Sequence, residues 1–165
     1  MSSSALETAR QLDKKFLTAR LKCDLGELAF DERDYGEAER WFKEALVANT
    51  ELHDQEMIAW VLSDLGRTSL EKEDSREAQR FFSQGLAIAE VIRRRDIIGR
   101  CKQGLAIIEH KANNYRVSRE LALEALEIFE RLGLRTEIEK TQALVERLEG
   151  EPSTHSGIGL QQCWC

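Results

Sequence analysis

The pattern Leu25-Gly26, Asp34-Tyr35-Gly36-Glu37-Ala38, Phe42 and Ala45-Leu46 occurs three times along the chain at a spacing of 40 residues. The second copy consists of Leu65-Gly66, Asp74-Ser75-Arg76-Glu77-Ala78, Phe82 and Gly85-Leu86. The third copy consists of Leu105-Ala106, Asn114-Tyr115-Arg116-Val117-Ser118, Ala122 and Ala125-Leu126. A fixed period of this length is typical of a solenoid, in which each unit is stacked on its neighbours. The pattern therefore predicts three units, at about residues 15–54, 55–94 and 95–134.

Each unit is predicted to contain two helices. The first helices are expected at about residues 15–32, 55–72 and 95–112, and the second at about 35–52, 75–92 and 115–132. Apolar residues recur at intervals of three and four, as in Ile58, Val61, Leu62 and Leu65, which places them on one helix face. Short polar segments between the helices favour turns and N-caps. We therefore expect an all-α fold, a solenoid of αα-hairpins.

The two ends of the array are predicted to differ from its middle. Ala5-Leu6 lies 40 residues before Ala45-Leu46, so the N-terminal segment is expected to be the second helix of an incomplete repeat. A capping helix is expected at 136–149, which completes a helical domain over 1–149 and leaves a flexible tail at 150–165. The N-terminal half repeat would expose an apolar face on Ala5, Leu6, Ala9 and Leu12. A homodimer through that end, or a longer parent protein, would each cover this face.

Composition excludes several classes of protein. The 165 residues carry a net charge of −6 and include a single proline, Pro152. An acidic chain lacks the basic excess that neutralises phosphates, so a nucleic-acid partner is not expected. No apolar run is long enough to span a membrane, and the first residues do not form a signal peptide. We expect a cytoplasmic protein with reduced thiols, because its four cysteines do not have the spacing of a disulfide framework.

The repeated residues resemble the tetratricopeptide repeat (TPR) family. The resemblance rests on the Leu-Gly pair of the first helix, on the Ala-x-x-x-Phe-x-x-Ala run of Ala38, Phe42 and Ala45, and on Tyr35. It extends over about residues 5–148. The period of 40 exceeds the 34 residues of the common form, and the usual proline after the second helix is missing. The resemblance implies a right-handed superhelix that acts as a non-catalytic scaffold or docking arm for other proteins.

The family likeness also implies a concave groove lined by the first helix of each unit. The candidate groove residues are Arg20, Cys23, Glu27, Phe30, Trp60, Ser63, Arg67, Leu70, Arg100, Gln103, Ile107 and His110. Arg20, Trp60 and Arg100 occupy equivalent positions and are expected to form a ladder that binds a peptide or helix of a partner protein. Arginine can grip a carboxylate with two hydrogen bonds, and tryptophan is a common interface anchor. The alternative is that Trp60 packs in the core and both arginines are solvated.

The sequence does not indicate catalysis. The three histidines lie far apart, and none belongs to a zinc-binding or catalytic motif. Cys101 and His110 are nine residues apart on a helix, which is not the arrangement of a nucleophile and its base. No phosphate-binding loop is present. We therefore expect no enzymatic activity, no cofactor and no metal.

The C-terminal tail ends in Cys163-Trp164-Cys165, an unusual ending for a solvated segment. Two thiols beside an indole can bind a soft metal, exchange disulfides, accept a lipid or insert into a groove. The tail can also be an incidental end. An alternative function follows, in which the chain is a carrier, the tail is the modified, metal-binding or docking site, and the repeats are the handle that another protein recognises.

Overall fold

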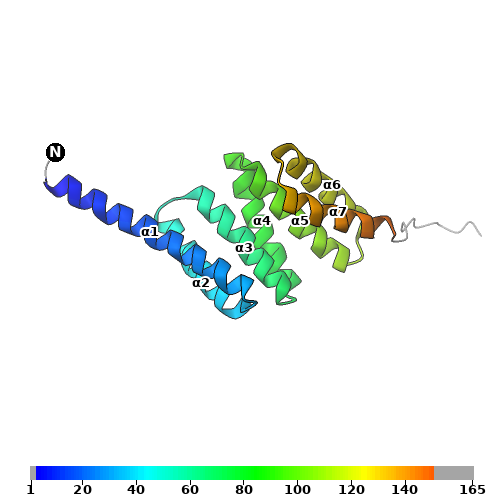
Figure 1. The fold of residues 1–165 in the computed structure, drawn as a ribbon, viewed down its shortest axis with the longest axis horizontal. Coiled ribbons are helices and arrows are strands. Elements are labelled where there is room, and N and C mark those ends of the chain that lie inside the picture. Colours follow the sequence, from blue (N-terminus) through cyan, green and yellow to red (C-terminus); the bar gives the residue numbers. More distant parts are fainter. Residues whose placement is uncertain (1–2, 151–165) are drawn as a thin grey trace, which may run out of the picture.

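The computed structural model describes residues 3–150, which form seven α-helices and no strand. The helices are α1 (Ser3–Asp31), α2 (Tyr35–Glu51), α3 (Gln55–Glu71), α4 (Ser75–Ile92), α5 (Arg95–Lys111), α6 (Tyr115–Leu132) and α7 (Arg135–Glu149). Each helix packs against the next one in the chain, so three αα-hairpins are stacked in a row and α7 closes the row (Figure 1). The prediction of an all-α hairpin solenoid is confirmed. None of the helices within residues 3–150 combines the length and the apolar character needed to cross a membrane.

The first helices of the units do not all contact one another. α3 also packs against α5, and α5 against α7, whereas α1 and α3 have no comparable contact. The N-terminal part of α1 projects away from the other helices (Figure 1). An opening therefore separates α1 from α3 on the inner side of the array.

One type of turn joins every pair of helices. A residue in the left-handed conformation recurs at intervals of 20 residues, at Arg33, His53, Glu73, Arg93, Asn113 and Gly133. At the first turn, the amide of Arg33 donates to the carbonyl of Phe30 at 3.0 Å, and the amide of Asp34 donates to that of Ala29 at 2.9 Å. These two bonds form a Schellman motif, which satisfies the last carbonyls of a helix. Because the turn geometry is the same each time, the units stack with one repeating geometry.

Three aspartates start helices in the first two units. Asp34 Oδ1 accepts a hydrogen bond from the amide of Glu37 at 3.1 Å, and Asp54 and Asp74 cap α3 and α4 in the same way. An N-cap of this kind satisfies an amide that has no partner within its own helix. The polar residues between two helices thus form the end of one helix and the N-cap of the next, and only two or three residues separate the helices.

Phe82 shows how the small residues hold neighbouring units together. Its ring is fully buried between Gly66 of its own unit and Gly104 of the next. A Cβ added at Gly104 would lie 2.3 Å from Phe82 Cζ, and one added at Gly66 would lie 2.7 Å from Phe82 Cε1. Both distances are far below van der Waals contact. The two glycines therefore let α3 and α5 approach α4 closely enough to bury the ring.

The third unit reaches the same packing with a different residue. Ala122 stands where the first two units have Phe42 and Phe82, and it is fully buried. The aromatic ring comes instead from Phe129, two turns further along α6, which packs on Gly99. A Cβ added at Gly99 would lie 2.6 Å from Phe129 Cε1. The repeat pattern therefore weakens at Ala122, although a glycine and a phenylalanine still meet.

The N-terminal segment is not a separate helix. The repeat register places a turn near Asp13, and the sequence predicted a half repeat before it, but α1 runs without a break from Ser3 to Asp31. No glycine or proline lies between Ser3 and Leu25, and the residues on either side of Asp13, namely Gln11, Leu12, Lys14 and Lys15, favour helix. The helix continues through the position of the expected turn, so the predicted boundary at residue 15 is wrong.

Candidate functional site

The inner side of the array contains three adjoining hollows, which we together call the inner groove. Their volumes are about 650, 400 and 240 Å³. Glu27 and Trp60 line both of the larger hollows, and Arg67 and Arg100 line both of the smaller ones. Most of the lining residues come from the first helices α1, α3 and α5. The inner groove thus follows the side on which the first helices face one another.

The largest hollow lies in the opening between α1 and α3. Its apolar part is formed by Phe16, Leu17, Met57 and Trp60. Its charged residues are Arg20, Asp24, Glu27, Asp54, Glu56 and Arg94. Apolar surface with a charged rim is the usual composition of a surface that binds another protein.

Asp64 organises the floor of the inner groove. This side chain is almost completely buried, and its Oδ1 accepts hydrogen bonds from Arg100 Nη2 at 2.7 Å and from Arg67 Nη1 at 3.0 Å. Burial raises the pKa of the Asp64 carboxyl, and the two guanidinium groups oppose that rise. Asp64 Oδ2 is buried without a hydrogen-bond partner among the described residues. A single carboxylate therefore positions both arginines.

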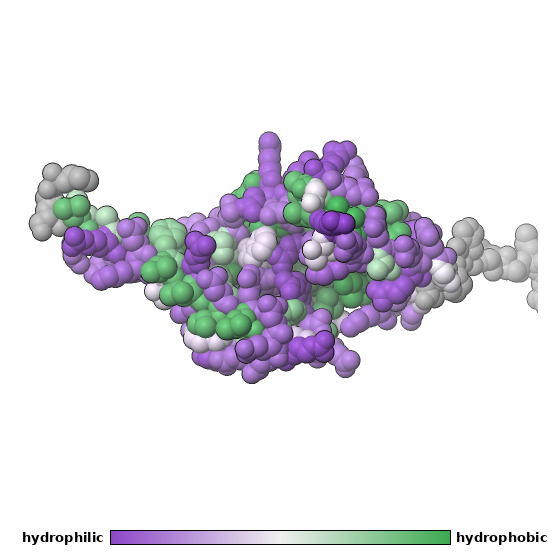
Figure 2. All heavy atoms as spheres, viewed as in Figure 1, coloured by the Kyte–Doolittle hydropathy of each residue, from purple (hydrophilic) through white to green (hydrophobic). Residues whose placement is uncertain are grey.

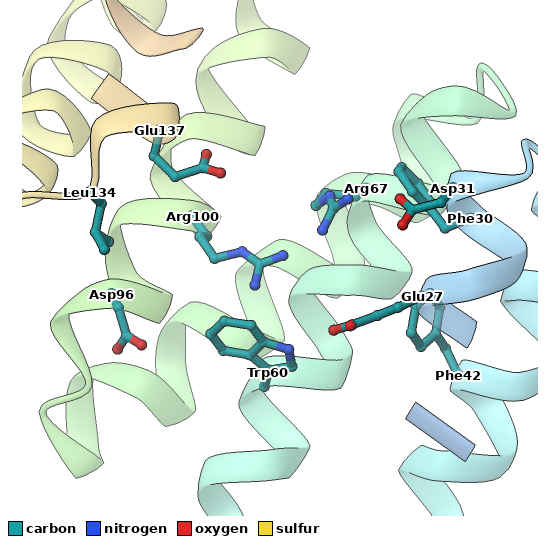
Figure 3. A pocket seen from close by; sticks show the side chains of 10 residues that line it. All are labelled: Glu27, Phe30, Asp31, Phe42, Trp60, Arg67, Asp96, Arg100, Leu134 and Glu137. Atoms are coloured by element: carbon teal, nitrogen blue, oxygen red, sulfur yellow. The ribbon is translucent and has the colours of Figure 1, made fainter. Parts of the chain in front are cut away.

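Each arginine also lies on an aromatic ring. Arg100 Cζ is 4.2 Å from the centroid of Trp60, and Arg67 Cζ is 4.4 Å from that of Phe30. At these distances the positive charge is attracted to the ring face. The Arg100 side chain is only 13% exposed, whereas that of Arg67 is 41% exposed. Both guanidinium groups are thus held in one orientation (Figure 3).

Glu27 faces this cluster from α1. Its carboxylate points across the opening toward Trp60 and Arg100 (Figure 3). Partial burial and the nearby Asp64 raise the pKa of Glu27, while the nearby indole of Trp60 and the charge of Arg100 oppose the rise. The carboxylate of Glu27 and the Arg100–Asp64 pair therefore lie on opposite sides of the same opening.

Most of the residues predicted for the groove line it. The hollows include Arg20, Cys23, Glu27, Phe30, Trp60, Arg67, Leu70, Arg100, Gln103 and Ile107. Ser63 does not, because it is fully buried and its hydroxyl donates to the Trp60 carbonyl at 2.7 Å. His110 lies outside the three hollows, with its ring edge-on to Tyr115 at 5.7 Å.

The predicted ladder forms only in part. Arg100 stacks on Trp60, but it grips the carboxylate of Asp64 in its own chain and is not free to grip one from a partner. Arg20 is exposed and lines the same hollow as Trp60. Asp64 was not among the predicted residues. Its signal in the sequence was a carboxylate on the apolar face of a helix, between Val61 and Leu65.

The thiols in the described part of the chain are not activated. Cys23 and Cys101 are buried, and burial raises their pKa to about 11 and about 12. At neutral pH both are protonated, which is the inert form of a thiol. Within residues 3–150, no three His, Cys, Asp or Glu side chains are grouped so that they could hold a metal ion. Cys163, Trp164 and Cys165 lie outside the described residues, so the prediction for the tail stays a prediction.

Comparisons with known proteins agree with this architecture. Residues 17–90 match the tetratricopeptide repeat family. Among solved structures, the crystal structure of BtubC (BKLC) from P. vanneervenii aligns with a TM-score of 0.66 and 19% sequence identity. The alignment covers 86% of this chain and 65% of that chain, so the present sequence spans less than two thirds of its length. No curated protein matches the sequence. The likeness to BtubC shows the fold alone.

Proposed function

Because residues 17–90 belong to the tetratricopeptide repeat family, we propose that this chain is a non-catalytic interaction module whose inner groove binds a segment of a partner protein. Tetratricopeptide repeats generally mediate protein–protein interactions. The observation that carries the proposal is that three hollows with shared lining residues follow one another along the first helices. An extended or helical segment laid in the groove contacts all three hollows at once.

The charges of the inner groove favour a basic partner segment. The three hollows are lined by eight acidic and five basic side chains, namely Asp24, Glu27, Asp31, Asp54, Glu56, Glu71, Asp96 and Glu137 against Arg20, Arg67, Arg94, Arg100 and Lys140. Arg100 is neutralised by Asp64, which is not among the eight, whereas Arg94 pairs with Asp96 and Glu56, and Lys140 pairs with Glu137, within the list. The lining residues therefore carry an excess of negative charge. A partner segment with Lys or Arg therefore complements the groove, and nucleic acid does not.

An apolar anchor is the second expected feature of the partner. The largest hollow offers Phe16, Met57 and Trp60 as its apolar surface. Large side chains that fill such a hollow supply most of the binding energy of an interface. We therefore propose a segment in which one aromatic or large aliphatic residue is flanked by basic residues.

A random peptide library displayed on phage tests this proposal. The expected result is that the peptides selected by the wild-type protein carry basic residues beside an apolar anchor. Trp60→Ala removes the apolar surface, and Glu27→Gln removes one negative charge from the centre of the groove. Each should weaken the selected peptides by about tenfold or more, which corresponds to about 1.4 kcal/mol.

Val91→Ala provides the matched control. Val91 is 82% exposed on the second helix α4 and lines none of the three hollows. Its substitution should leave the affinity unchanged. Peptides that bind Trp60→Ala and Glu27→Gln as tightly as the wild type would contradict the proposal, and so would a library that yields no binding peptide.

A further inference from the structure

Four leucines on α1 form an exposed apolar face, which we call the α1 outer stripe. They are Leu17, Leu21, Leu25 and Leu28, with exposed fractions of 59%, 51%, 39% and 54%. Leu17 lies at the edge of this stripe and also lines the largest hollow of the inner groove. In the space-filling view, hydrophobic side chains gather over the left part of the molecule, where α1 lies (Figure 2). Large apolar side chains this exposed, one after another along a helix, usually mark a surface that binds another protein.

The repeat register shows what this face lacks. The residues at 40-residue intervals from Leu21 are Val61, Cys101 and Thr141, and all three are fully buried. Those at the same intervals from Leu28 are Thr68, Ile108 and Leu148, which are 0%, 7% and 0% exposed. In every case a second helix of the preceding unit covers them, α2 on α3, α4 on α5 and α6 on α7. On α1 the equivalent face has no such cover within residues 3–150.

We propose that a second copy of this chain covers the α1 outer stripe, so that two α1 helices pack antiparallel about a twofold axis at Leu17. Leu6, Leu17 and Leu28 are separated by 11 residues, close to three helical turns, and so lie on one side of α1. An antiparallel pair centred on Leu17 places Leu6 of each copy against Leu28 of the other. Leu17 then meets its own counterpart at the axis.

One charged pair along this face is complementary in the same register, whereas Lys14 and Arg20, each three residues from Leu17, place like charges at the same level. Arg10 and Asp24 each lie seven residues from Leu17, so the twofold axis brings Arg10 of one copy opposite Asp24 of the other. Neither residue forms an ion pair within the described part of the chain. The arrangement is isologous, which means that each favourable contact occurs twice.

The length and direction of α1 suit this arrangement. α1 has 29 residues and α2 has 17, so the N-terminal part of α1 extends well past the end of its own hairpin partner. In the proposed pair, this projecting part lies along the outer stripe of the other copy. It runs antiparallel to that copy's α1, as α2 runs antiparallel to α3 (Figure 1). The projecting helix thus takes the place that a preceding second helix would have.

The other end of the array does not suit a head-to-tail stack. The outward face of α7 carries Glu139, Gln142 and Glu146, and all three are exposed. Stacking that face on the α1 outer stripe would bury charged side chains against leucines, which costs free energy. A contact between two copies of the outer stripe places Leu6 against Leu28 and Leu17 against Leu17, with Asp13 of each copy opposite Leu21 of the other.

The oligomeric state of the full chain in solution tests the proposal. Light scattering after size-exclusion chromatography should give about twice the chain mass of 18.9 kDa for the wild type. Leu17→Glu should give the monomer mass, because it places two like charges at the twofold axis. Val91→Glu, on exposed α4 surface, should leave the dimer intact. A monomeric wild type, or a dimer that Leu17→Glu does not weaken, would overturn the proposal.

A charge exchange tests the antiparallel register itself. Arg10→Glu and Asp24→Arg should each raise the dissociation constant by about tenfold, because each change creates two like-charge contacts. The double variant Arg10→Glu/Asp24→Arg should restore a dissociation constant within about threefold of the wild type, as expected for a directly coupled pair. Circular dichroism of each variant reports whether the helices remain folded. A double variant as weak as the single ones would refute this register.

Discussion

Arg100 Nη2 on α5 donates a hydrogen bond to Asp64 Oδ1 on α3 at 2.7 Å, and the contact joins two successive repeats at the floor of the inner groove. The same guanidinium lies on the ring of Trp60. One ion pair therefore contributes to the packing of the repeats and also fixes the orientation of the central aromatic residue in the groove. Stability and the shape of the candidate site are coupled at this point.

Removal of Asp64 should destabilise the array strongly. Asp64→Ala leaves Arg100, whose side chain is only 13% exposed, without its counterion, and should lower the free energy of unfolding by about 3 kcal/mol. Arg67→Ala should cost about 1 kcal/mol or less, because Arg67 is 41% exposed. Urea denaturation of Asp64→Ala, Arg100→Ala and the double variant measures the coupling, expected at about 1.5 kcal/mol or more. If the losses in unfolding free energy of the two single variants add up to that of the double variant, the contact between Asp64 and Arg100 does not contribute to stability.

The left-handed turn residues should limit stability. Glu73 adopts a φ of 62°, a conformation that costs a residue with a side chain about 1 kcal/mol relative to glycine. Glu73→Gly should therefore raise the free energy of unfolding by up to about 1 kcal/mol. Gly133, at the equivalent turn with φ of 67°, gives the reciprocal control, since Gly133→Ala should lower stability by a similar amount. A stabilised Gly133→Ala would disprove this account of the turns.

Glycine at position 104 should be required for packing between repeats. An alanine there would place its Cβ 2.3 Å from Phe82 Cζ, so Gly104→Ala should lower the free energy of unfolding by about 1–3 kcal/mol. Gly36→Ala is the matched control, because its nearest neighbour would be 3.7 Å away. That substitution should be neutral or stabilising by up to about 1 kcal/mol through helix propensity. Equal effects at the two positions in thermal unfolding would contradict the packing argument.

The buried thiols should make stability depend on alkaline pH. The folded chain raises the pKa of Cys101 to about 12 from the 9.0 of an unperturbed thiol. The folded state therefore binds the proton more tightly, so this contribution is complete below pH 9.0 and is lost as the pH rises toward 12. Between these limits the wild type should lose about 1.4 kcal/mol per pH unit relative to Cys101→Ala. Parallel pH profiles of the two proteins would contradict the burial of this thiol as a neutral group.

The same two cysteines should resist alkylation in the folded protein. With a pKa of about 11 for Cys23, the thiolate fraction at pH 8 is about one in a thousand, and access is blocked as well. In a chain with Cys163→Ser and Cys165→Ser, iodoacetamide should react only after urea is added. Mass spectrometry counts the modified thiols, and rapid alkylation of the native chain would disprove their protection.

The fold was predictable because the sequence repeats. Leu25-Gly26, Leu65-Gly66 and Leu105-Ala106 set the period of 40, and the polar turns between them separate the two helices of each unit. The continuous α1 was not predicted, because the similarity of Ala5-Leu6 to Ala45-Leu46 indicates a helix but not whether a turn follows it. The turn is missing because the residues around Asp13 favour helix. The repeat register therefore predicts which face of a helix a residue lies on more reliably than it predicts where a helix ends.

The candidate site was predictable as a face but not as a set of contacts. The family resemblance implied a groove along the first helices, and the register gave Trp60 and Arg100 equivalent positions there, where both line the inner groove. It did not reveal that Arg100 is held by Asp64, since the two residues are 36 positions apart and meet only after α3 packs on α5. The exposed outer stripe on α1 was also missed, because Leu21 and Leu28 occupy the same repeat positions as residues that are buried in the later units. Only the absence of a covering helix distinguishes them.

Nuclear magnetic resonance of the tryptophan indole groups tests the central claim most directly. Trp60 lines the inner groove, whereas Trp41 lies on the second helix α2, outside the three hollows and beneath Arg40. In a chain with Trp164→Phe, two indole N–H signals remain, and a basic peptide from the library selection is titrated into the labelled protein. The account predicts that the Trp60 signal shifts in proportion to bound peptide while the Trp41 signal stays in place. A shift of Trp41 alone, or of neither signal at saturating peptide, would contradict binding in the inner groove.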